Sequence, residues 1–529
     1  MSRPHEGGQR TMGVNESGRA GVREWAALGV LTMPVLLMSI DLTVLAVAIP
    51  ELSEHLSPTG TELLWIVDIY GFFLAALLVL MGSVGDRIGR RRLLLIGAGA
   101  FGAASTLAAF AWSPTVLIIA RALLGIGGAT LMPSTLALIR NLFVDPDQRR
   151  RAVAVWVAAF AGGAGLGPVV GGLLLEHFWW GSVFLINVPV MLILLIATVL
   201  LVPEFKAARR GRFDLISAAL LVTTLLLAVY ALKDAAEHGW GAQHALWFLA
   251  SGVLGTVFVL RQQRLAEPLI DVSLFRSLPF STAVLANLAG VFALTALLYY
   301  LPQYLQSVLG KSPLQAGLWA LPIAFGAICG SMLAAPLMRL LHAGWLIGGG
   351  LVLAALGYIT VAQLGLELNS LLAFNGGLLI GTGIGIADTL SNDIIVATAP
   401  ADRAGAAAGI SETAYELGGA LGTATLGALG TSLYRQDVTA AIPANTPPDI
   451  AQHLTETIGS AVAIAEHMPD REATTILDIV RPAFTDAMTT AFTAASAILA
   501  IIGILAATML VTKHRTPASR LGGTVRRTV

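Results

Sequence analysis

Six carboxylic acids interrupt stretches of the sequence that are otherwise apolar: Asp41, Asp68, Asp388, Asp393, Glu412 and Glu416. A charged carboxylate is costly inside a membrane, so each of these acids should face the protein interior or water. Burial favours the neutral, protonated form of a carboxyl group. A protonated acid does not attract a cation, whereas an ionised one does. A proton and a cation can therefore compete for the same carboxylate, which is the chemistry of an antiporter.

Spacing and position suggest which acids bind a cationic substrate. Glu412 and Glu416 are four residues apart near the middle of their apolar segment, so they share one face of a helix. Asp388 lies slightly to one side of the middle of the preceding segment. We predict that these three acids bind the substrate. Aromatic faces also attract organic cations, and three tyrosines near acids or in mid-segment are candidate contacts: Tyr70, Tyr299 and Tyr415.

The remaining acids receive different predictions. Asp41 and Asp68 lie in the first two apolar segments, and we predict that they couple transport to protons. Asp393 lies near the end of its segment, where an ion pair with Arg403 is the expected role. For any single acid of the six, a structural hydrogen-bonding role remains an open alternative.

Apolar segments dominate the chain that must hold these acids. Of its 529 residues 56% are apolar and 12% are charged, with a mean hydropathy of +0.77, whereas soluble domains carry roughly 25% charged residues. A spanning helix needs about 20 mostly apolar residues. We therefore predict an all-α integral membrane protein with 14 transmembrane helices at 26–50, 62–83, 93–112, 115–139, 152–175, 181–202, 213–232, 244–261, 279–304, 314–338, 342–364, 371–399, 404–430 and 487–512.

The distribution of Lys and Arg predicts the orientation, because these residues gather on the cytoplasmic side of a membrane. With the N-terminus in the cytoplasm, cytoplasmic segments hold 26 of them and outer segments hold 5. We therefore expect both termini inside and an even number of spans. The predicted parts are an N-terminal tail (1–25), a six-helix bundle (26–203), two inserted helices (204–262), a second six-helix bundle (279–512) and a C-terminal tail (513–529).

The segment 431–486 is the long outer loop of the second bundle. Its pattern predicts short amphipathic helices at 449–467 and 470–481, between prolines. Its acidic residues outnumber its arginines. The loop is expected to be a solvated cap, and the alternative is an acidic lip that attracts cations.

The sequence excludes several classes of function. Gly310-Lys311-Ser312 matches the end of a phosphate-binding loop, but Leu305 stands where its first Gly is required. The single cysteine, Cys329, excludes an internal disulfide and a Cys-based metal site. The charges balance at 32 basic and 32 acidic residues, which gives no electrostatic basis for nucleic-acid binding. A secondary transporter or a channel remains, with no enzyme activity and no metal or other cofactor expected.

The loop between the second and third segments combines glycines and charges at fixed spacing. The stretch GSVGDRIGR contains Gly82, Asp86, Arg87, Gly89 and Arg90. The glycines permit close helix packing, and Asp86 is placed to pair with an Arg at a neighbouring helix end. This pattern resembles the signature loop of the major facilitator superfamily, G-x-x-x-D-R-x-G-R-[RK]. The resemblance implies two six-helix halves that rock around a central cavity.

Two other segments resemble motifs of the same superfamily. Arg121 lies in LIIARALLGIGGA, which is similar to l-x-x-x-R-x-x-q-G-x-G, and this resemblance implies a role in proton transfer. Gly163, Gly167, Pro168 and Gly171 match the G-x-x-x-G-P-x-x-G-G motif of antiporters. Proline bends a helix and glycines admit a close neighbour, so these four residues form a predicted conformational motif. Plain packing roles remain the alternative for both segments.

Shorter stretches resemble one branch of the superfamily, the 14-span drug:proton antiporters. They are SIDLTVLAVAIP at 39–50, WIVDIY at 65–70, FLINVP at 184–189 and SETAYELG at 411–418. Within the branch, the likeness is to the quaternary-ammonium and dye exporters of the QacA, SmvA and LfrA type. The resemblance implies a monomer in the bacterial inner (plasma) membrane that exports small lipophilic cations, such as ethidium, in exchange for protons. Some relatives that accept divalent cations carry an acid in the segment matching 314–338, which has none here, so we expect a preference for monovalent cations.

Other functions on the same fold remain open. A dedicated exporter of one antibiotic or other natural product would use the same residues. A lipid translocator would not depend on the charges of Glu412 and Glu416. A nutrient importer is disfavoured by the antiporter motif, and a channel has no use for the facilitator loop.

Overall fold

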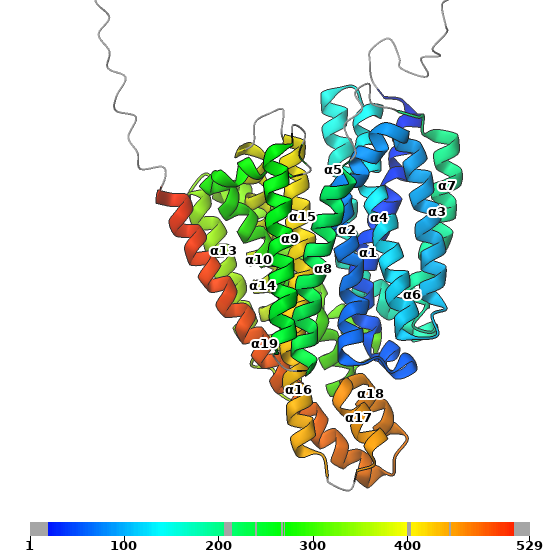
Figure 1. Cartoon of the computed structure of the whole chain (residues 1–529), viewed down its shortest axis with the longest axis vertical. Helices are drawn as coiled ribbons and strands as arrows, with labels where there is room; N and C mark the ends of the chain where they lie inside the picture. Colours follow the sequence, from blue (N-terminus) through cyan, green and yellow to red (C-terminus); the bar gives the residue numbers. More distant parts are fainter. Residues whose placement is uncertain are drawn as a thin grey trace, which may run out of the picture. The chain divides into compact units, whose positions relative to one another are not determined.

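The computed structural model describes residues 20–205, 214–238, 241–265, 268, 270–398, 404–443 and 446–512. Within these ranges the secondary structure is helical and contains no strand, which confirms the predicted all-α class (Figure 1). The helices are α1 (Val22–Leu56), α2 (Gly60–Ile88), α3 (Arg90–Ala109), α4 (Pro114–Leu142), α5 (Pro146–His177), α6 (Ser182–Leu185), α7 (Asn187–Leu201), α8 (Leu215–His238), α9 (Ala242–Arg264), η1 (Val272–Arg276), α10 (Leu278–Gln303), η2 (Tyr304–Val308), α11 (Pro313–Leu318), α12 (Leu321–Leu337), α13 (Ala343–Val361), α14 (Ser370–Thr398), α15 (Ala404–Gly422), η4 (Thr423–Gly427), α16 (Ala428–Ala441), α17 (Pro448–Glu456), α18 (Ile458–Glu466) and α19 (Asp470–Thr512).

Twelve helices of the described residues are long and apolar enough to cross a membrane. The chain is thus a multi-pass membrane protein. Helices also occupy the two other predicted windows, with α8 beginning at Leu215 in the window 213–232 and α15, η4 and α16 covering 404–430. However, α8 has only a short apolar run, Leu215–Ala231. The count of 14 spans stays a prediction.

The chain divides into two compact units. Unit 1 comprises residues 1–58, 65–222 and 312–317, and unit 2 comprises 59–64, 223–311 and 318–529. In unit 1, α1 packs along α5 and α7, and α3 packs along α4. In unit 2, α13 packs against both α14 and α19, and α10 packs against α15. The domain boundaries predicted from the sequence remain predictions.

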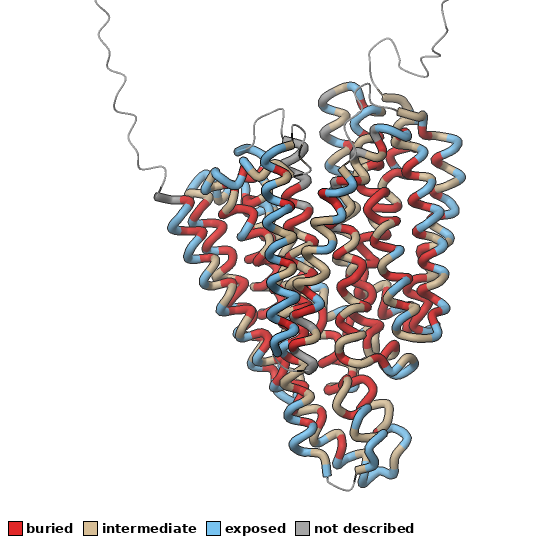
Figure 2. The backbone as a smooth tube through the Cα atoms, in the orientation of Figure 1, coloured by how far each residue is buried: buried red, intermediate tan, exposed pale blue. Residues whose placement is uncertain are grey.

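Helix α1 is apolar on all sides, and its neighbours in unit 1 cover most of it. In its most apolar window 78% of the residues are buried, compared with 17% for α9. An evenly apolar helix with this burial belongs to a protein interior, and Figure 2 shows the buried positions along it. Asp41, in the middle of α1, therefore faces protein rather than lipid.

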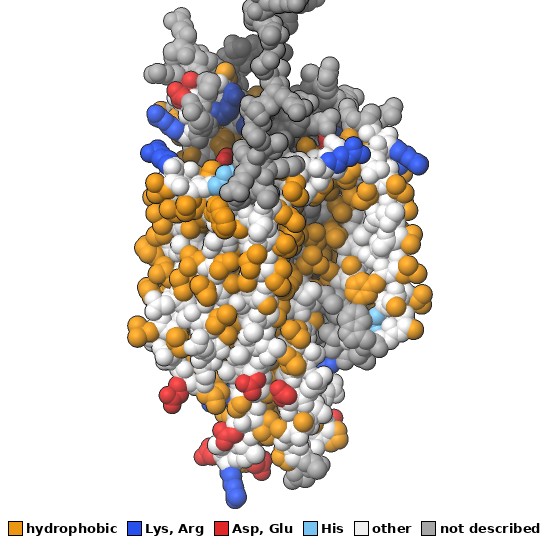
Figure 3. Space-filling model, turned by 90° about the vertical axis from the view of Figure 1, so that its left-hand side faces the viewer, with side chains coloured by type: hydrophobic (Ala, Val, Ile, Leu, Met, Phe, Trp, Pro, Cys, Tyr) orange, Lys and Arg blue, Asp and Glu red, His pale blue; other side chains and the backbone are white. Residues whose placement is uncertain are grey.

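Exposed apolar side chains mark the surface that faces lipid. On α19 they include Ile501, Ile504 and Leu505. The face shown in Figure 3 carries a broad band of hydrophobic side chains, with Lys and Arg predominating at one end and Asp and Glu at the other. Such a band is the surface that a bilayer requires.

The outer loop differs from the prediction. The expected helix at 449–467 is two helices, α17 and α18, because Thr457 is extended and its side chain caps α18 by accepting a hydrogen bond from the Ser460 backbone N–H at 3.1 Å. The expected short helix at 470–481 is instead the beginning of α19, which continues through Pro482 to Thr512. Proline removes one backbone hydrogen bond, and the burial of Val480 and Phe484 on the flanking turns offsets that loss.

Two predicted spans are interrupted. The span at 181–202 divides into α6 and α7 at Ile186, and the span at 314–338 divides into α11 and α12. Apolar composition alone does not encode these breaks. The first break makes Asn187, a buried residue, the first residue of α7.

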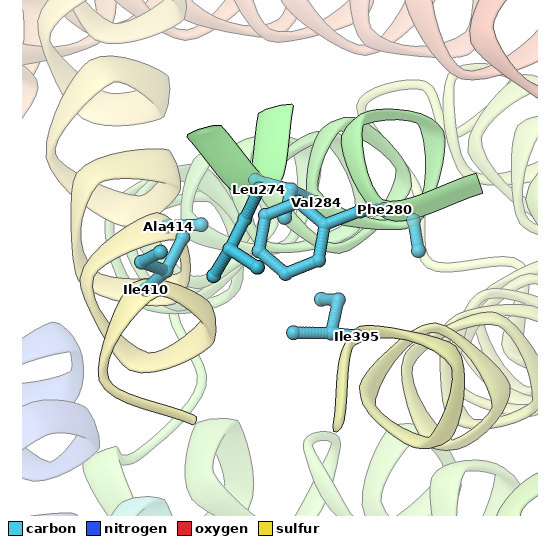
Figure 4. Packing of buried hydrophobic residues seen from close by; sticks show 7 residues of the cluster. Leu274, Phe280, Val284, Ile395, Ile410 and Ala414 are labelled. Atoms are coloured by element: carbon cyan, nitrogen blue, oxygen red, sulfur yellow. The ribbon is translucent and has the colours of Figure 1, made fainter. Parts of the chain in front are cut away.

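A small apolar core joins four elements of unit 2 near the beginning of α10. It consists of Leu274 on η1, Phe280, Ala283 and Val284 on α10, Ile395 on α14, and Ile410 and Ala414 on α15. Figure 4 shows these side chains converging between the three helices. The core fixes α10, α14 and α15 side by side, one turn from polar residues on the same helices.

Candidate functional site

Asp41 and Arg121 form a buried ion pair in unit 1. Arg121 Nη1 donates to Asp41 Oδ2 at 2.6 Å, and each residue is 1% exposed. Arg121 Nε also donates to the carbonyl oxygen of Ile66 at 3.1 Å. The guanidinium lies 4.6 Å from the ring centre of Tyr70, within the range of a cation–π contact. An arginine within a span must be paired or hydrated, and here it is paired.

The second oxygen of Asp41 binds an amide. Asn187 Nδ2 donates to Asp41 Oδ1 at 3.1 Å and to Ser105 Oγ at 3.2 Å. We call Asp41, Tyr70, Ser105, Arg121 and Asn187 the N-terminal cluster. It joins α1, α2, α3, α4 and α7: α4 and α7 contact the acid directly, and α2 and α3 contact its two partners.

Neither Ser105 nor Asn187 was among the predicted site residues. Asn187 stands in FLINVP, one of the stretches that resembles the antiporter branch. An amide in an apolar segment needs a hydrogen-bond partner, and this was the available signal. Ser105 carries no comparable signal, because a serine can satisfy its hydroxyl within its own helix.

The glycines of the antiporter motif bring α5 close to α1 around Asp41. A Cβ atom added at Gly163 would lie 2.5 Å from the Leu36 carbonyl oxygen, and one at Gly171 would lie 2.7 Å from Val44 Cγ2. A Cβ at Gly167 would collide with the Thr43 hydroxyl. The motif therefore sets the distance between the two helices, and Pro168 lies inside α5 between these contacts.

Asp68 and Tyr70 belong to the segment of α2 that faces Arg121. The carbonyl of Val67 accepts from Arg121 Nη2 at 3.5 Å, and the adjacent Asp68 is buried. The structure thus places both predicted proton-coupling acids on helices that contact Arg121. Tyr70, predicted as a substrate contact, presents its ring to Arg121 in this structure.

A second polar cluster lies in unit 2. Asn287 Nδ2 donates to Asn392 Oδ1 at 3.3 Å and to Ser411 Oγ at 3.0 Å, and Asn392 Nδ2 donates to Asp388 Oδ1 at 3.2 Å. The Ser411 hydroxyl also donates to Asn392 Oδ1. We call these four residues the C-terminal cluster. Asp388 is thereby linked to α10 and α15 through Asn392, a residue that the sequence did not single out.

The other predicted substrate residues occupy different positions. Glu416 is buried on α15 and Tyr415 is half-buried beside it. The side chain of Glu412 lies outside the described residues, so its predicted pairing with Glu416 on one face is not described. Tyr299 packs edge-on against Tyr300 at 4.9 Å. It stands twelve residues beyond Asn287 on α10, or about 18 Å along the helix, and does not join the C-terminal cluster.

A groove of about 370 Å³ opens between α11, α12 and α14. It is lined by Leu318, Trp319, Leu321, Pro322, Phe325 and Phe374. This lining is apolar and includes none of the predicted acids.

The facilitator loop binds the end of α7 through its backbone. The Glu204 carboxylate accepts hydrogen bonds from the N–H groups of Arg91 at 3.1 Å and Arg92 at 3.2 Å, at the beginning of α3. A carboxylate at a helix N-terminus is favourable. Gly89 has φ +110°, and a Cβ there would lie 2.5 Å from Glu204 Oε1, so only glycine fits this position.

Other residues of the loop are less informative. Arg87 is exposed, Gly82 is half-buried, and the side chain of Arg90 folds against Gly85. The side chain of Asp86 and the whole of Arg403 lie outside the described residues, as do the ion pairs expected for Asp86 and for Asp393 with Arg403. The contact with Glu204 was not predicted, since nothing in the sequence marks this glutamate.

Comparison with known proteins is consistent with these motifs. The sequence profile of the Major Facilitator Superfamily matches residues 33–423. The chain is 45% identical to the "Multidrug efflux pump LfrA" of Mycolicibacterium smegmatis over 499 residues, covering 94% of this chain and 98% of that protein. It is 35% identical to the "Methyl viologen resistance protein SmvA" of Salmonella typhimurium, covering 91% and 97%.

A solved structure shares the fold. The crystal structure of a bacterial homologue of the human lysosomal transporter Spinster, inward-facing and unoccupied, matches with a TM-score of 0.66 at 16% identity, covering 94% of this chain and all of the other. At that identity the match shows the fold alone. Because the family profile spans most of the chain and the relatives match nearly end to end, the chain belongs to the major facilitator superfamily, as a membrane transporter related to multidrug efflux pumps.

Proposed function

We propose that this protein is a proton-coupled antiporter that exports lipophilic organic cations by alternating access. The observation that carries the proposal is the buried Asp41–Arg121 ion pair. A proton arriving at Asp41 neutralises the carboxylate and removes the Coulomb attraction to Arg121, which is strong away from water. Protonation therefore favours a rearrangement of α1 and α4, the two helices that carry the pair.

The proposed topology is that of the 14-span drug:proton antiporter branch in the bacterial plasma membrane, with both termini in the cytoplasm. The 26 to 5 distribution of Lys and Arg supports this orientation. The separation of basic and acidic side chains in Figure 3 supports it as well. In this proposal, α8 and the helical stretch over 404–430 are the two spans beyond the twelve.

A cationic substrate is supported by one buried acid, Glu416, and one half-buried acid, Asp388, in unit 2. Glu416 and Asp388 lie on α15 and α14, which pack against each other. We assign them, with Glu412, to the substrate and assign Asp41, Asp68 and Arg121 to the proton. The name of the Salmonella relative, a methyl viologen resistance protein, points to a cationic compound for that protein.

The membrane potential supplies enough energy for this exchange. Moving one charge through 100 mV is worth about 2.3 kcal/mol. Exchange of one proton for one monovalent cation moves no net charge, whereas two inward protons per exported cation move one net charge. Since about 1.4 kcal/mol corresponds to a tenfold ratio, the two-proton exchange sustains a gradient of tens-fold. ATP is not required.

The decisive experiment follows ethidium in inside-out vesicles under an imposed pH gradient, for the wild type, Asp41→Asn and Glu412→Gln. Gradient-dependent uptake that either substitution abolishes is the expected result. Gradient-independent uptake would contradict proton coupling. Methyl viologen, a dication, should be a poorer substrate than ethidium, and equal rates would contradict the expected preference for monovalent cations.

A dedicated antibiotic exporter is the second candidate. The chain is 32% identical over 96% of its length to the tetracenomycin C resistance and export protein of Streptomyces glaucescens. A panel of dyes and quaternary ammonium compounds separates the two functions. Transport of several unrelated cations supports the first candidate, and transport of none by a folded protein supports the second.

A further inference from the structure

The side-chain amide of Asn187 binds the oxygen of Asp41 that Arg121 leaves available. Its Nδ2 donates to Asp41 Oδ1 at 3.1 Å and to Ser105 Oγ at 3.2 Å. Asp41, Ser105 and Asn187 are all buried. The amide stands at the first position of α7, directly after Ile186.

The two partners of Asp41 differ in what they can offer. A guanidinium has donors and no acceptor, so Arg121 can donate to Asp41 but cannot accept a hydrogen bond from the hydroxyl of protonated Asp41. An amide has an acceptor as well as donors, and a hydroxyl can act as either. Asn187 and Ser105 can therefore form hydrogen bonds around Asp41 before and after it takes a proton.

The geometry allows this change without moving a helix. In the described orientation Asn187 donates, which suits an ionised Asp41, and its Oδ1 is buried with no hydrogen-bond partner among the described residues. Turning the amide by half a turn exchanges Nδ2 and Oδ1. The carbonyl oxygen would then accept from protonated Asp41 and from the Ser105 hydroxyl. Each orientation keeps two hydrogen bonds.

We propose that Asn187 is a positioning residue that keeps Asp41 hydrogen-bonded in both protonation states and thereby sets the pH at which Asp41 exchanges its proton. The inference rests on the proposed function, in which Asp41 carries the proton. The charged and titratable groups in contact with this site are Arg121 from α4 and Tyr70 from α2, and Asp68 is buried on the same helix as Tyr70. The α5 glycines that approach α1 around Asp41 are Gly163, Gly167 and Gly171, which do not titrate.

Replacing Asn187 should move the protonation midpoint in a defined direction. Leucine has nearly the same shape and no polar atoms, so Asn187→Leu deletes both hydrogen bonds. A hydrogen bond to an ionised group is about twice as strong as one between neutral groups. The ionised state therefore loses more than the protonated state, and the midpoint should rise by about one pH unit, a tenfold change in the ratio of the two forms.

The test uses the full-length protein in lipid vesicles. Infrared spectra recorded across a pH series follow the carbonyl stretch of protonated carboxyl groups, and the part due to Asp41 is identified by its loss in Asp41→Asn. Wild type is compared with Asn187→Leu, with Asn187→Gln, which restores an amide, and with Thr198→Val. Thr198 is a buried residue of α7, on the same face eleven residues further along, or about 16 Å away.

The expected result is a higher midpoint in Asn187→Leu, a return towards the wild-type value in Asn187→Gln and no change in Thr198→Val. The pH profile of ethidium transport should shift with the infrared midpoint. An unchanged midpoint in Asn187→Leu would overturn the inference. An equal shift in Thr198→Val would also overturn it, because the effect would then reflect general repacking.

The infrared readout separates this inference from the proposed function. Wild-type protein that fails to move ethidium under a pH gradient, yet shows the Asn187-dependent midpoint, would refute cation antiport and retain the role of Asn187. If Asn187→Leu does not yield folded protein, Asn187→Ala decides the matter, because it deletes the same two hydrogen bonds. An unchanged midpoint in Asn187→Ala would count against the proposal.

Discussion

Removing one partner of the Asp41–Arg121 ion pair should lower the unfolding free energy far more than replacing both partners with apolar residues. Asp41→Leu leaves the Arg121 charge buried, and loss of one partner of a buried pair costs about 3–5 kcal/mol. Arg121→Met leaves the carboxylate buried at a similar cost of about 3–5 kcal/mol. In the double variant no charge remains, and the principal residual cost is the orphaned Asn187 donor, about 1–3 kcal/mol.

The coupling energy from this double-mutant cycle should therefore reach at least about 3 kcal/mol, the upper end of values for residues in contact. Unfolding free energies can be measured for the four proteins by SDS titration in mixed micelles, followed by tryptophan fluorescence. The protein contains ten tryptophans for this purpose.

A more exposed ion pair in unit 2 provides the matched control. Arg435 Nη2 lies 3.1 Å from Glu456 Oε2, and the two side chains are 24% and 16% exposed. The cycle of Arg435→Met and Glu456→Leu should give about 0.2–1 kcal/mol, the range for exposed pairs. If the losses at Asp41 and Arg121 are additive, so that their coupling energy is no larger than that of the control pair, the reasoning is refuted.

Three further outcomes test the packing. Gly167→Ala should lower the thermal midpoint of unfolding, because the added Cβ meets the Thr43 hydroxyl, and the destabilisation should be about 1–3 kcal/mol. Gly162→Ala should leave the midpoint unchanged, because its Cβ has open space around it. Gly89→Ala should lower the midpoint through its positive φ and its approach to Glu204; an intact midpoint would argue against this loop geometry. Glu456→Gln should speed backbone hydrogen exchange in 448–466, because the carboxylate holds both Arg435 and the N–H of Gly60; unchanged exchange would remove that role.

Hydropathy predicts the helices because the bilayer imposes a length and an apolar composition on each of them. It does not predict the breaks, since Ile186 and Thr457 lie in stretches whose composition continues on both sides. The amphipathic pattern predicts a helix at 470–481, but it does not predict that this helix continues into the span at 487–512, because Pro482 lies between the two. Tertiary packing holds α19 helical through this proline.

The candidate site was predictable in part. The energetic cost of an arginine within a span predicts that Arg121 is paired or hydrated, but it does not predict which acid is its partner. That partner, Asp41, lies 80 residues away in sequence. The hydrogen bonds of Asn187, Ser105 and Asn392 depend on which helix faces meet. Tyr70 was assigned to a substrate cation from its residue type, and the structure shows that an internal cation already faces its ring.

The sequence distance between Asp41 and Arg121 also bears on how the protein enters the membrane. Chains grow at about 5–20 residues per second, so the 80 residues that separate the pair take about 4–16 s to synthesise at that rate. During this interval α1 is made without the arginine that later balances its acid. Its strongly apolar sequence, with a window hydropathy of 2.1, is what allows the first segment to insert while carrying that acid. A charge added to α1 should therefore impair biogenesis more than the same charge added to a helix synthesised after Arg121.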